Sequence, residues 1–353
     1  MSRFVLLASA FWFITLPAFG SEDDCSAVGD IDFVCGPVNA EDLVHVPDSR
    51  WIIASRAIPN GSLALIDTET RSWGVADLLA PALDAERYPD CTEPPIAEAF
   101  ASHGLSLRRL DDGTLTLAVV GHGARESIEI YAVDLSAAKP MLEWRGCILT
   151  PGALAANSVS LASDGSLLAT IPLDAGRTIP EAITGAATGA VYAWAPGDAG
   201  MTRLEGTELP YPNGIEIAED GQHFYVVTSG GGQFIEFANT RPVAERRRSD
   251  RLDFVPDNLR RAPDGRMLTA GLVASDEVCG DVWDGEVFDL AAFAACPRPF
   301  VVRAIDPETF DGEDLLRGPR IETFSNLTIG IVIGESIWMG TFAGDRVALF
   351  EMD

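Results

Sequence analysis

Short apolar alternations, each introduced by an Asp-Gly pair, recur along the chain. The pairs stand directly before runs rich in Leu, Val, Thr and aromatic residues, at Asp112-Gly113, Asp164-Gly165, Asp220-Gly221 and Asp264-Gly265. Asp-Gly next to β-forming runs predicts tight hairpins, with type I′ turns in which both central residues take positive φ. The chain is therefore expected to consist mainly of β-hairpins.

The spacing of these hairpins indicates a structural repeat. The four glycines are separated by 52, 56 and 44 residues. A period near 50 residues with several short strands per unit is typical of a β-propeller with one four-stranded blade per repeat, and about 330 residues then form six blades. The sequence predicts an all-β fold, a six-bladed β-propeller over residues 21–353. We expect its N-terminal segment to pair with the last strands, because propellers avoid an open sheet edge.

The first twenty residues have the features of an export signal. The apolar run Phe4–Leu16 is too short to span a bilayer, and small residues follow where signal peptidase cleaves. We predict a signal peptide over residues 1–20, cleavage before Ser21, and a secreted or periplasmic protein without a later membrane span. A retained N-terminal anchor is the alternative.

The cysteines fit an oxidising compartment. There are six of them, which allow 15 pairings. Neighbours in sequence suggest the pairs Cys25–Cys35 and Cys279–Cys296, which would leave Cys91–Cys147. The best helical pattern, Glu286–Ala295, lies inside the Cys279–Cys296 loop, and we interpret it as an insertion between blades.

Charge narrows the choice of partners. The chain has 25 Lys and Arg against 53 Asp and Glu, a net charge of −28. Such a surface repels phosphate backbones, so nucleic acid is excluded as a partner, and docking on anionic lipid is disfavoured. Binding of cations is compatible with this charge.

Polar residues stand at one phase of the predicted repeat, just before the apolar alternation of each blade. His103, Asn157, Asn213 and Asn258 follow one another at intervals of 54, 56 and 45 residues. Equivalent positions of successive blades lie at equivalent places around the ring, so these side chains are expected to converge at one mouth of the central channel.

Convergent amide and carboxylate oxygens are the ligands that Ca²⁺ requires. Glu41-Asp42 lies 62 residues before His103, at the same phase. The alternative is that the asparagines and aspartates only cap turns. The predicted calcium cage consists of Glu41, Asn157, Asn213, Asp257 and Asn258.

Two of the four histidines are candidates for catalysis. His103 shares the phase of the predicted ligands, and His122 lies one hairpin later, a distance that can return its side chain to the same channel mouth. Two imidazoles in contact can share a proton, one acting as base while the other tunes it. His45 and His223 lie in strand-like runs and are interpreted as structural.

Several of these segments together resemble a known family. The segments are His103–Ser106, Ala118–His122, Ser127–Tyr131, Tyr211–Ile215, Pro256–Leu259 and Ile337–Thr341, with Glu41-Asp42 and Asn157. With them the chain resembles the serum paraoxonases and their relatives, which are calcium-dependent lactonases and arylesterases. That family belongs to the wider six-bladed group of gluconolactonase-like and strictosidine-synthase-like proteins.

The resemblance implies a catalytic pair, His103 and His122, and a catalytic calcium ion in the cage. It also implies a second calcium, on Asp42 and the Leu105 carbonyl. Ser158 stands where that second site usually has an aspartate, so we expect the second ion to be weak or absent.

The resulting hypothesis is a hydrolase of lactones or aryl esters, with a small-molecule substrate. Glu41 or Asp257 is the competing candidate for base or nucleophile. A gluconolactonase-type sugar lactonase and a non-catalytic exported propeller that binds a ligand at the channel mouth remain as alternatives.

Overall fold

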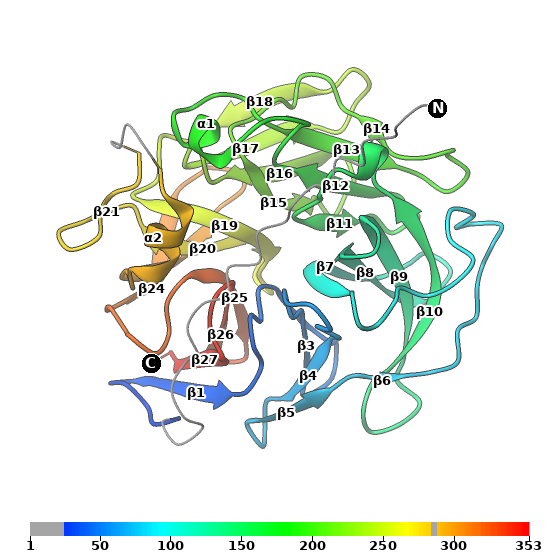
Figure 1. Cartoon of the computed structure of the whole chain (residues 1–353), viewed down its shortest axis with the longest axis horizontal. Helices are drawn as coiled ribbons and strands as arrows, with labels where there is room; N and C mark the ends of the chain where they lie inside the picture. The colour runs from blue at the N-terminus through cyan, green and yellow to red at the C-terminus, as the bar shows by residue number, and fades with distance from the viewer. Residues whose placement is uncertain (1–24, 284–287, 353) are drawn as a thin grey trace, which may run out of the picture.

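Six small sheets surround a central channel in the computed structural model, which describes residues 25–283 and 288–352 (Figure 1). The predicted six-bladed β-propeller is confirmed. The predicted signal peptide and its cleavage site lie outside the described residues. No helix in the described ranges is long and apolar enough to cross a membrane.

The blades follow one another in chain order, and neighbouring innermost strands contact each other around the channel. From the innermost strand outward, the first blade holds β2 (Leu43–His45), β3 (Trp51–Ala54), β4 (Ala64–Asp67) and β5 (Ser72–Val75). The second holds β7 (Ala101–Arg109), β8 (Leu115–His122), β9 (Ser127–Asp134), β10 (Met141–Leu149) and β6 (Asp77–Leu78), which pairs in parallel. The third holds β11 (Val159–Leu161), β12 (Leu167–Ile171), β13 (Ala190–Trp194) and β14 (Thr202–Arg203).

The remaining blades complete the ring. The fourth holds β15 (Pro212–Ile217), β16 (His223–Thr228), β17 (Gln233–Ala238) and β18 (Ala244–Arg248). The fifth holds β19 (Phe254–Arg261), β20 (Met267–Val273), β23 (Phe300–Ile305) and β24 (Gly312–Gly318). The sixth holds β25 (Leu327–Ile333), β26 (Ser336–Thr341), β27 (Arg346–Glu351) and β1 (Ile31–Cys35). A short 3₁₀ turn (Pro151–Ala153) and helix α1 (Ile179–Ile183) lie in the connections.

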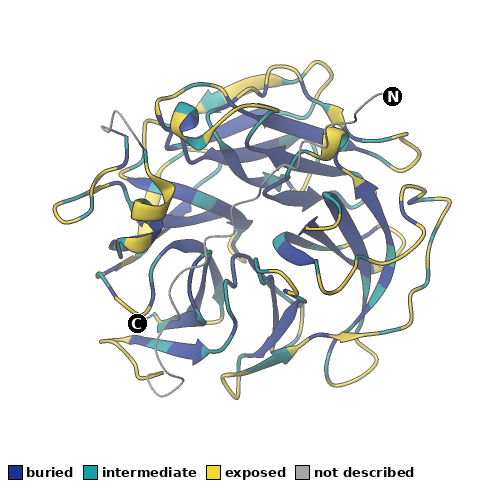
Figure 2. Ribbon diagram, in the orientation of Figure 1, coloured by how far each residue is buried: buried dark blue, intermediate teal, exposed yellow. Residues whose placement is uncertain are grey.

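Burial follows the position of a strand within its blade. Every residue of β8 is buried, whereas the outermost strands β18 and β24 are largely exposed (Figure 2). The second strands of the blades (β3, β8, β12, β16, β20 and β26) are covered on both faces because each blade packs against two neighbours. This explains why their sequences are apolar almost throughout, whereas a strand with one wet face would alternate.

The Asp-Gly pairs each join the first and second strands of a blade, as predicted, but the turn type is different. Positive φ is found at the glycines, 87° at Gly113 and 84° at Gly165 for example, and not at the preceding aspartates. Each aspartate instead accepts a hydrogen bond from the backbone N–H two residues later, as Asp112 does from Thr114 at 2.8 Å. The prediction of type I′ turns is therefore wrong, because the aspartate side chain stabilises a type I turn that the glycine completes.

The N-terminal strand closes the ring. β1 pairs antiparallel with β27, from Ile31 opposite Phe350 to Cys35 opposite Arg346, as expected. The Cys25–Cys35 disulfide holds the preceding segment, and Cys91–Cys147 and Cys279–Cys296 form the other two bridges. All three predicted pairings are confirmed.

The predicted insertion lies inside a blade. It runs between β20 and β23 of the fifth blade and contains β21 (Ser275–Asp276), β22 (Gly280–Asp281) and helix α2 (Leu290–Ala295). The prediction that it lies between blades is wrong. The connection between β20 and β23 can be lengthened within the fifth blade without changing the order or pairing of the strands. The Arg298 guanidinium ties it down by donating to the carbonyl oxygens of Ala274, Cys279 and Gly280. The predicted helix starts earlier, at Glu286, and that residue lies outside the described ranges.

Ring closure predicts a contrast between two neighbouring residues of β1. Phe33 is buried against Phe324 and the Arg346 side chain, whereas Asp32 makes an ion pair with Arg71 in which both side chains are 44% exposed. We expect Phe33→Ala to lower the free energy of unfolding by about 3 kcal/mol. Asp32→Ala, the matched control, should cost less than about 1 kcal/mol. Equal effects in thermal or urea unfolding would contradict a closure that depends on packing.

Candidate functional site

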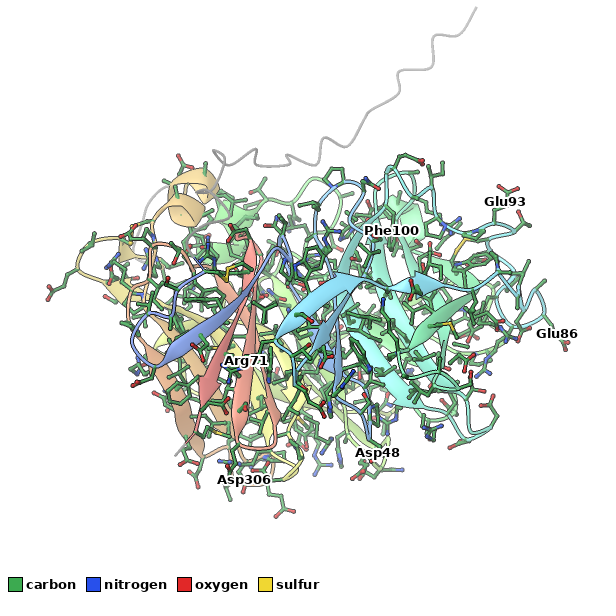
Figure 3. The ribbon with its side chains drawn as sticks, turned by 90° about the horizontal axis from the view of Figure 1, so that it is seen from below. Asp48, Arg71, Glu86, Glu93, Phe100 and Asp306 are labelled. Carbon is green, nitrogen blue, oxygen red and sulfur yellow. A yellow bond between two sulfur atoms is a disulfide. The ribbon has the colours of Figure 1, made fainter. Side chains whose placement is uncertain are left out.

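The candidate residues lie at one end of the channel, where the innermost strands begin. In a side view, Phe100, just before β7, lies at one face of the ring, and Asp48, just after β2, at the opposite face (Figure 3). The β7, β15 and β19 strands each interrupt their pairing at this end, between Ser102 and Leu105 in β7 for example. Such bulges turn side chains out of the regular alternation. The residues left unpaired include His103, Asn213, Asp257 and Asn258.

Glycines allow these bulges to pack closely around the channel. A Cβ on Gly214 would lie 2.4 Å from the Leu259 backbone nitrogen, and one on Gly104 would lie 2.3 Å from the Asn157 carbonyl oxygen. Each glycine thus brings the bulge of one blade against the backbone of the next. The predicted convergence of equivalent positions follows from this packing.

Glu41 lies at the centre of the cluster, just before β2. Its side chain is buried, with 1% of the residue exposed. Oε1 accepts a hydrogen bond from Nδ2 of Asn258 at 2.7 Å, and Oε2 lies 3.5 Å from Nε2 of His103. The first, second and fifth blades therefore meet at this carboxylate.

Four buried side-chain oxygens in this cluster lack a hydrogen-bond partner among the described residues. They are Glu41 Oε2, Asn157 Oδ1, Asn213 Oδ1 and Asn258 Oδ1. An unsatisfied buried polar atom costs about 1–3 kcal/mol and is rare in native proteins, so four at one site need an explanation.

The amide orientations explain why the oxygens are left over. Nδ2 of Asn213 donates to Ser229 Oγ at 2.9 Å, and Ser229 in turn donates to the Pro256 carbonyl. Nδ2 of Asn258 is taken by Glu41. Because both amide nitrogens are engaged, Oδ1 of Asn213 and Oδ1 of Asn258 are left free to bind a cation. Amide oxygens of this kind are typical calcium ligands.

Asp257 adds a second carboxylate. Burial, and then the negative charge of Glu41, raise the pKa of Asp257 well above its usual range. A cation held between the two carboxylates would relieve this repulsion. The described residues contain no group of three or more His, Cys, Asp or Glu arranged to hold a metal ion, so a cation here depends on the asparagine oxygens as well.

The two candidate histidines are in contact. Nδ1 of His103 lies 2.9 Å from Nε2 of His122, whose Nδ1 lies 2.5 Å from Oε2 of Glu126. Because the Glu126 carboxylate accepts, His122 carries its proton on Nδ1 and offers Nε2 as an acceptor. His103 then donates from Nδ1, and its Nε2, which faces Glu41 Oε2, is the atom of this ring that gains or loses a proton.

The electrostatic environments of the two rings differ. Burial lowers the pKa of His103, but attraction to the Glu41 carboxylate outweighs this effect, so the net pKa is raised. Burial and the neighbouring His103 lower the pKa of His122, although Glu126 acts in the opposite direction. His103 is therefore the more basic ring of the pair.

The oxygens predicted for a second calcium are engaged by an arginine. Asp42 Oδ2 and the Leu105 carbonyl oxygen both accept hydrogen bonds from Nη2 of Arg260, the latter at 2.5 Å. Leu105 N–H also donates to Asp42 Oδ2, at 2.7 Å. Ser158, predicted to weaken this second site, is fully buried, and its Oγ has no hydrogen-bond partner in the described part of the chain.

A cavity of about 550 Å³ opens above the polar cluster. Its floor includes Glu41, His103, His122, Asn157, Asn213 and Asp257. Its walls are apolar and include residues of both helices and of the adjoining connections: Ile58, Pro59, Ile179, Ile183, Val255, Leu272, Val282, Phe288, Leu290, Phe293, Leu327 and Phe342. α1 and α2 therefore contribute apolar side chains to the walls of a cavity whose floor is polar.

Most residues of this floor were predicted from the sequence, but three residues that support it were not. All predicted cage and histidine positions come together, with Asn258 beneath the floor against Glu41. Glu126, Ser229 and Arg260 were not predicted. The signal available for Glu126 was a carboxylate four residues after His122. The signal available for Arg260 was a charged residue in the segment that the sequence places next to the channel, two residues after Asn258. Ser229 carries no local signal.

Comparison with known proteins supports the fold. The sequence matches no protein-family model and no curated protein. A gluconolactonase from Xanthomonas campestris has a similar structure, with a TM-score of 0.54 at 17% identity over 92% of this chain and 89% of that one. Regucalcin from Agrobacterium tumefaciens, a calcium-binding protein, gives a TM-score of 0.53 at 12% identity over 90% and 92%. A luciferin-regenerating enzyme gives 0.53 at 11% over 92% and 97%.

At these identities the likeness shows a shared fold. The structures support the predicted six-bladed β-propeller, and a place within the lactonase-like group stays a prediction. The narrower resemblance to paraoxonases stays a prediction.

The close approach at Gly214 yields a test of the site's packing. Gly214→Ala should destabilise the protein by about 1–3 kcal/mol, because the new methyl group meets backbone atoms of Asp257, Asn258 and Leu259. Gly74→Ala in β5 is the matched control, since a Cβ there meets nothing within 4 Å. If both variants melt at the wild-type temperature, the bulges do not pack as described.

Proposed function

We propose that this protein is a calcium-dependent hydrolase of apolar lactones or aryl esters. The observation that supports the proposal is the set of four unpartnered buried oxygens next to the His103–His122 pair, at the floor of an apolar cavity. The fold it shares with a gluconolactonase and with calcium-binding regucalcin is compatible with this activity.

The ion would be held by the predicted cage, Glu41, Asn157, Asn213, Asp257 and Asn258. Two carboxylates and three neutral amides balance a divalent charge, and the hard oxygen donors suit calcium. The chemistry that a bound Ca²⁺ supplies is polarisation of the ester carbonyl and stabilisation of the oxyanion.

His103 is the proposed general base. When the ring is neutral, its Nε2 at the cavity floor can remove a proton from an attacking water molecule. The positive charge that develops is then shared through Nδ1–H to His122, and from His122 to the Glu126 carboxylate. His122 and Glu126 are positioning residues in this scheme, since they fix the tautomer of His103.

The cavity walls indicate the substrate class. Apolar side chains from α1, α2 and the connections around them suit an acyl chain or an aromatic ring. A sugar lactone would present hydroxyl groups to these walls without hydrogen-bonding partners, which is costly. The fold relationship to a gluconolactonase keeps sugar lactones as the second candidate.

Export is part of the proposal. Three disulfides fit a protein that folds in an oxidising compartment, as the predicted signal peptide implies. A small molecule is then the proposed partner, in a secreted or periplasmic setting.

Removal of calcium should abolish activity and lower stability together. Dialysis against EGTA would leave Glu41 and Asp257 facing each other without a cation, and a ligand that binds the folded state raises stability by mass action. The measurement is hydrolysis of phenyl acetate, a long-chain γ-lactone and gluconolactone, with melting curves before and after EGTA.

The same assays distinguish the alternative functions. Preference for gluconolactone would favour the sugar lactonase. Retained calcium without hydrolysis of any of them would favour a binding protein.

Variants separate the candidate bases. His103→Gln should lower kcat by about 10²–10⁴, the usual range for a general base, while calcium stays bound. Glu126→Gln should lower kcat on the order of tenfold, the loss of one charge-assisted hydrogen bond, with KM unchanged. If His103→Gln keeps most activity while Asp257→Ala loses it with calcium still bound, a carboxylate carries the chemistry and the histidine role is wrong.

A further inference from the structure

Arg260 lies where the first, second and fifth blades approach one another, two residues after Asn258 in β19. Only 9% of the residue is exposed. Its Nη2 donates to Asp42 Oδ2 and to the Leu105 carbonyl oxygen, and its Nη1 donates to the Leu259 carbonyl oxygen at 3.2 Å. The Nε group lies 3.5 Å from the Leu43 carbonyl oxygen. The guanidinium is thus surrounded by acceptors from the first, second and fifth blades.

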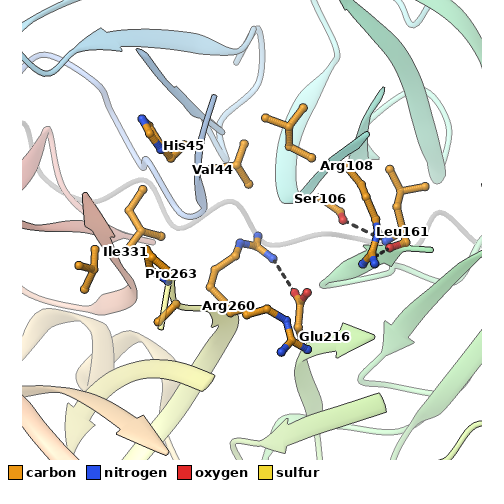
Figure 4. Close-up of a pocket in the computed structure, with 13 residues that line it drawn as sticks. Val44, His45, Ser106, Arg108, Leu161, Glu216, Arg260, Pro263 and Ile331 are labelled. Carbon is orange, nitrogen blue, oxygen red and sulfur yellow. Dashed lines mark hydrogen bonds and ion pairs between the residues drawn. The ribbon is translucent and has the colours of Figure 1, made fainter. Parts of the chain in front are cut away.

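The far side of Arg260 faces a second cavity. This cavity, of about 300 Å³, is lined by the far ends of the innermost strands, including His45 and Arg108 (Figure 4). There Nη1 lies 3.8 Å from Oε2 of Glu216, in the fourth blade. Arg260 lines this far cavity and not the one above Glu41, so it stands between the two.

The position of Nη2 excludes a metal ion on the same oxygens. Calcium binds its oxygen ligands at about 2.3–2.6 Å. Nη2 already lies 2.5 Å from the Leu105 oxygen and is in contact with Asp42 Oδ2. A cation placed on this pair of oxygens would overlap the guanidinium and add its charge to that of the arginine.

Charge balance agrees with this exclusion. Asp42 is fully buried, and Leu43 N–H and Leu105 N–H donate to its two oxygens. The Asp42 carboxylate is matched by the guanidinium. Glu216, 3.8 Å from Nη1, lies near the further positive charges of Arg261 and Arg108. Neither of these carboxylates is left without a cation for a dication to neutralise. Ser158, at the position where the resemblance implies a further carboxylate, supplies a neutral hydroxyl.

We propose that Arg260 is a built-in cation that takes the place of a second calcium ion, so that no calcium binds to the Asp42 and Leu105 oxygens. The total of one calcium per molecule rests in addition on the cage of the proposed function. The guanidinium joins the three blades permanently, and this link does not depend on the supply of metal. The proposal does not require that the protein be a hydrolase.

The test is the number of calcium ions per chain. Wild-type protein, dialysed against calcium-free buffer after loading, should retain one ion by elemental analysis. The double variant Arg260→Ser/Ser158→Asp removes the guanidinium and adds a carboxylate, and should retain two. Two controls, Ser158→Asp alone and Arg108→Ser in the far cavity, should keep the wild-type number.

The outcomes are distinguishable. Two ions in the wild-type protein overturn the proposal, and this measurement does not depend on whether any variant folds. A folded double variant that gains no ion overturns it as well. A wild-type protein without calcium, with one ion in the double variant, supports the role of Arg260 and removes the proposed catalytic cage instead.

Discussion

Two consecutive carboxylates, Glu41 and Asp42, are buried where the first blade meets the channel, and the rest of the site is arranged around them. Neighbouring residues of an extended chain point in different directions, so Glu41 contacts the cavity floor and Asp42 contacts Arg260. A buried charge is tolerated only with a partner of opposite sign or a full set of hydrogen bonds. Asp42 has both, whereas Glu41 Oε2 faces unpartnered amide oxygens and His103.

The propeller brings these groups together because each blade contributes the same place in its innermost strand. The bulges at His103, Asn213 and Asp257-Asn258 break the sheet pairing at that place and free the side chains to point into the channel. The rest of each blade is a rigid, buried support, as the uninterrupted burial of β8 shows. A site built this way has a fixed floor and walls that change with the connecting segments.

The segments that connect the strands form much of the cavity walls, and they can vary while the fold stays the same. The Cys279–Cys296 insertion adds α2 to the cavity wall without disturbing the ring, and α1 does the same from the third blade. The similar structures at 11–17% identity share the scaffold, and a shared scaffold does not by itself set the function.

The sequence by itself determined the repeat, the six blades and most residues of the floor, whereas it only suggested the disulfide pairs. These features are encoded locally, by Asp-Gly turns, by apolar runs and by one polar phase per repeat. Tertiary structure alone decided which way each amide turns, that Glu126 supports His122, and that Arg260 occupies the oxygens of Asp42 and Leu105. Arg260 and Asp42 are 218 residues apart. Their contact depends on how closely the fifth and first blades approach each other, and no local pattern in the chain records that distance.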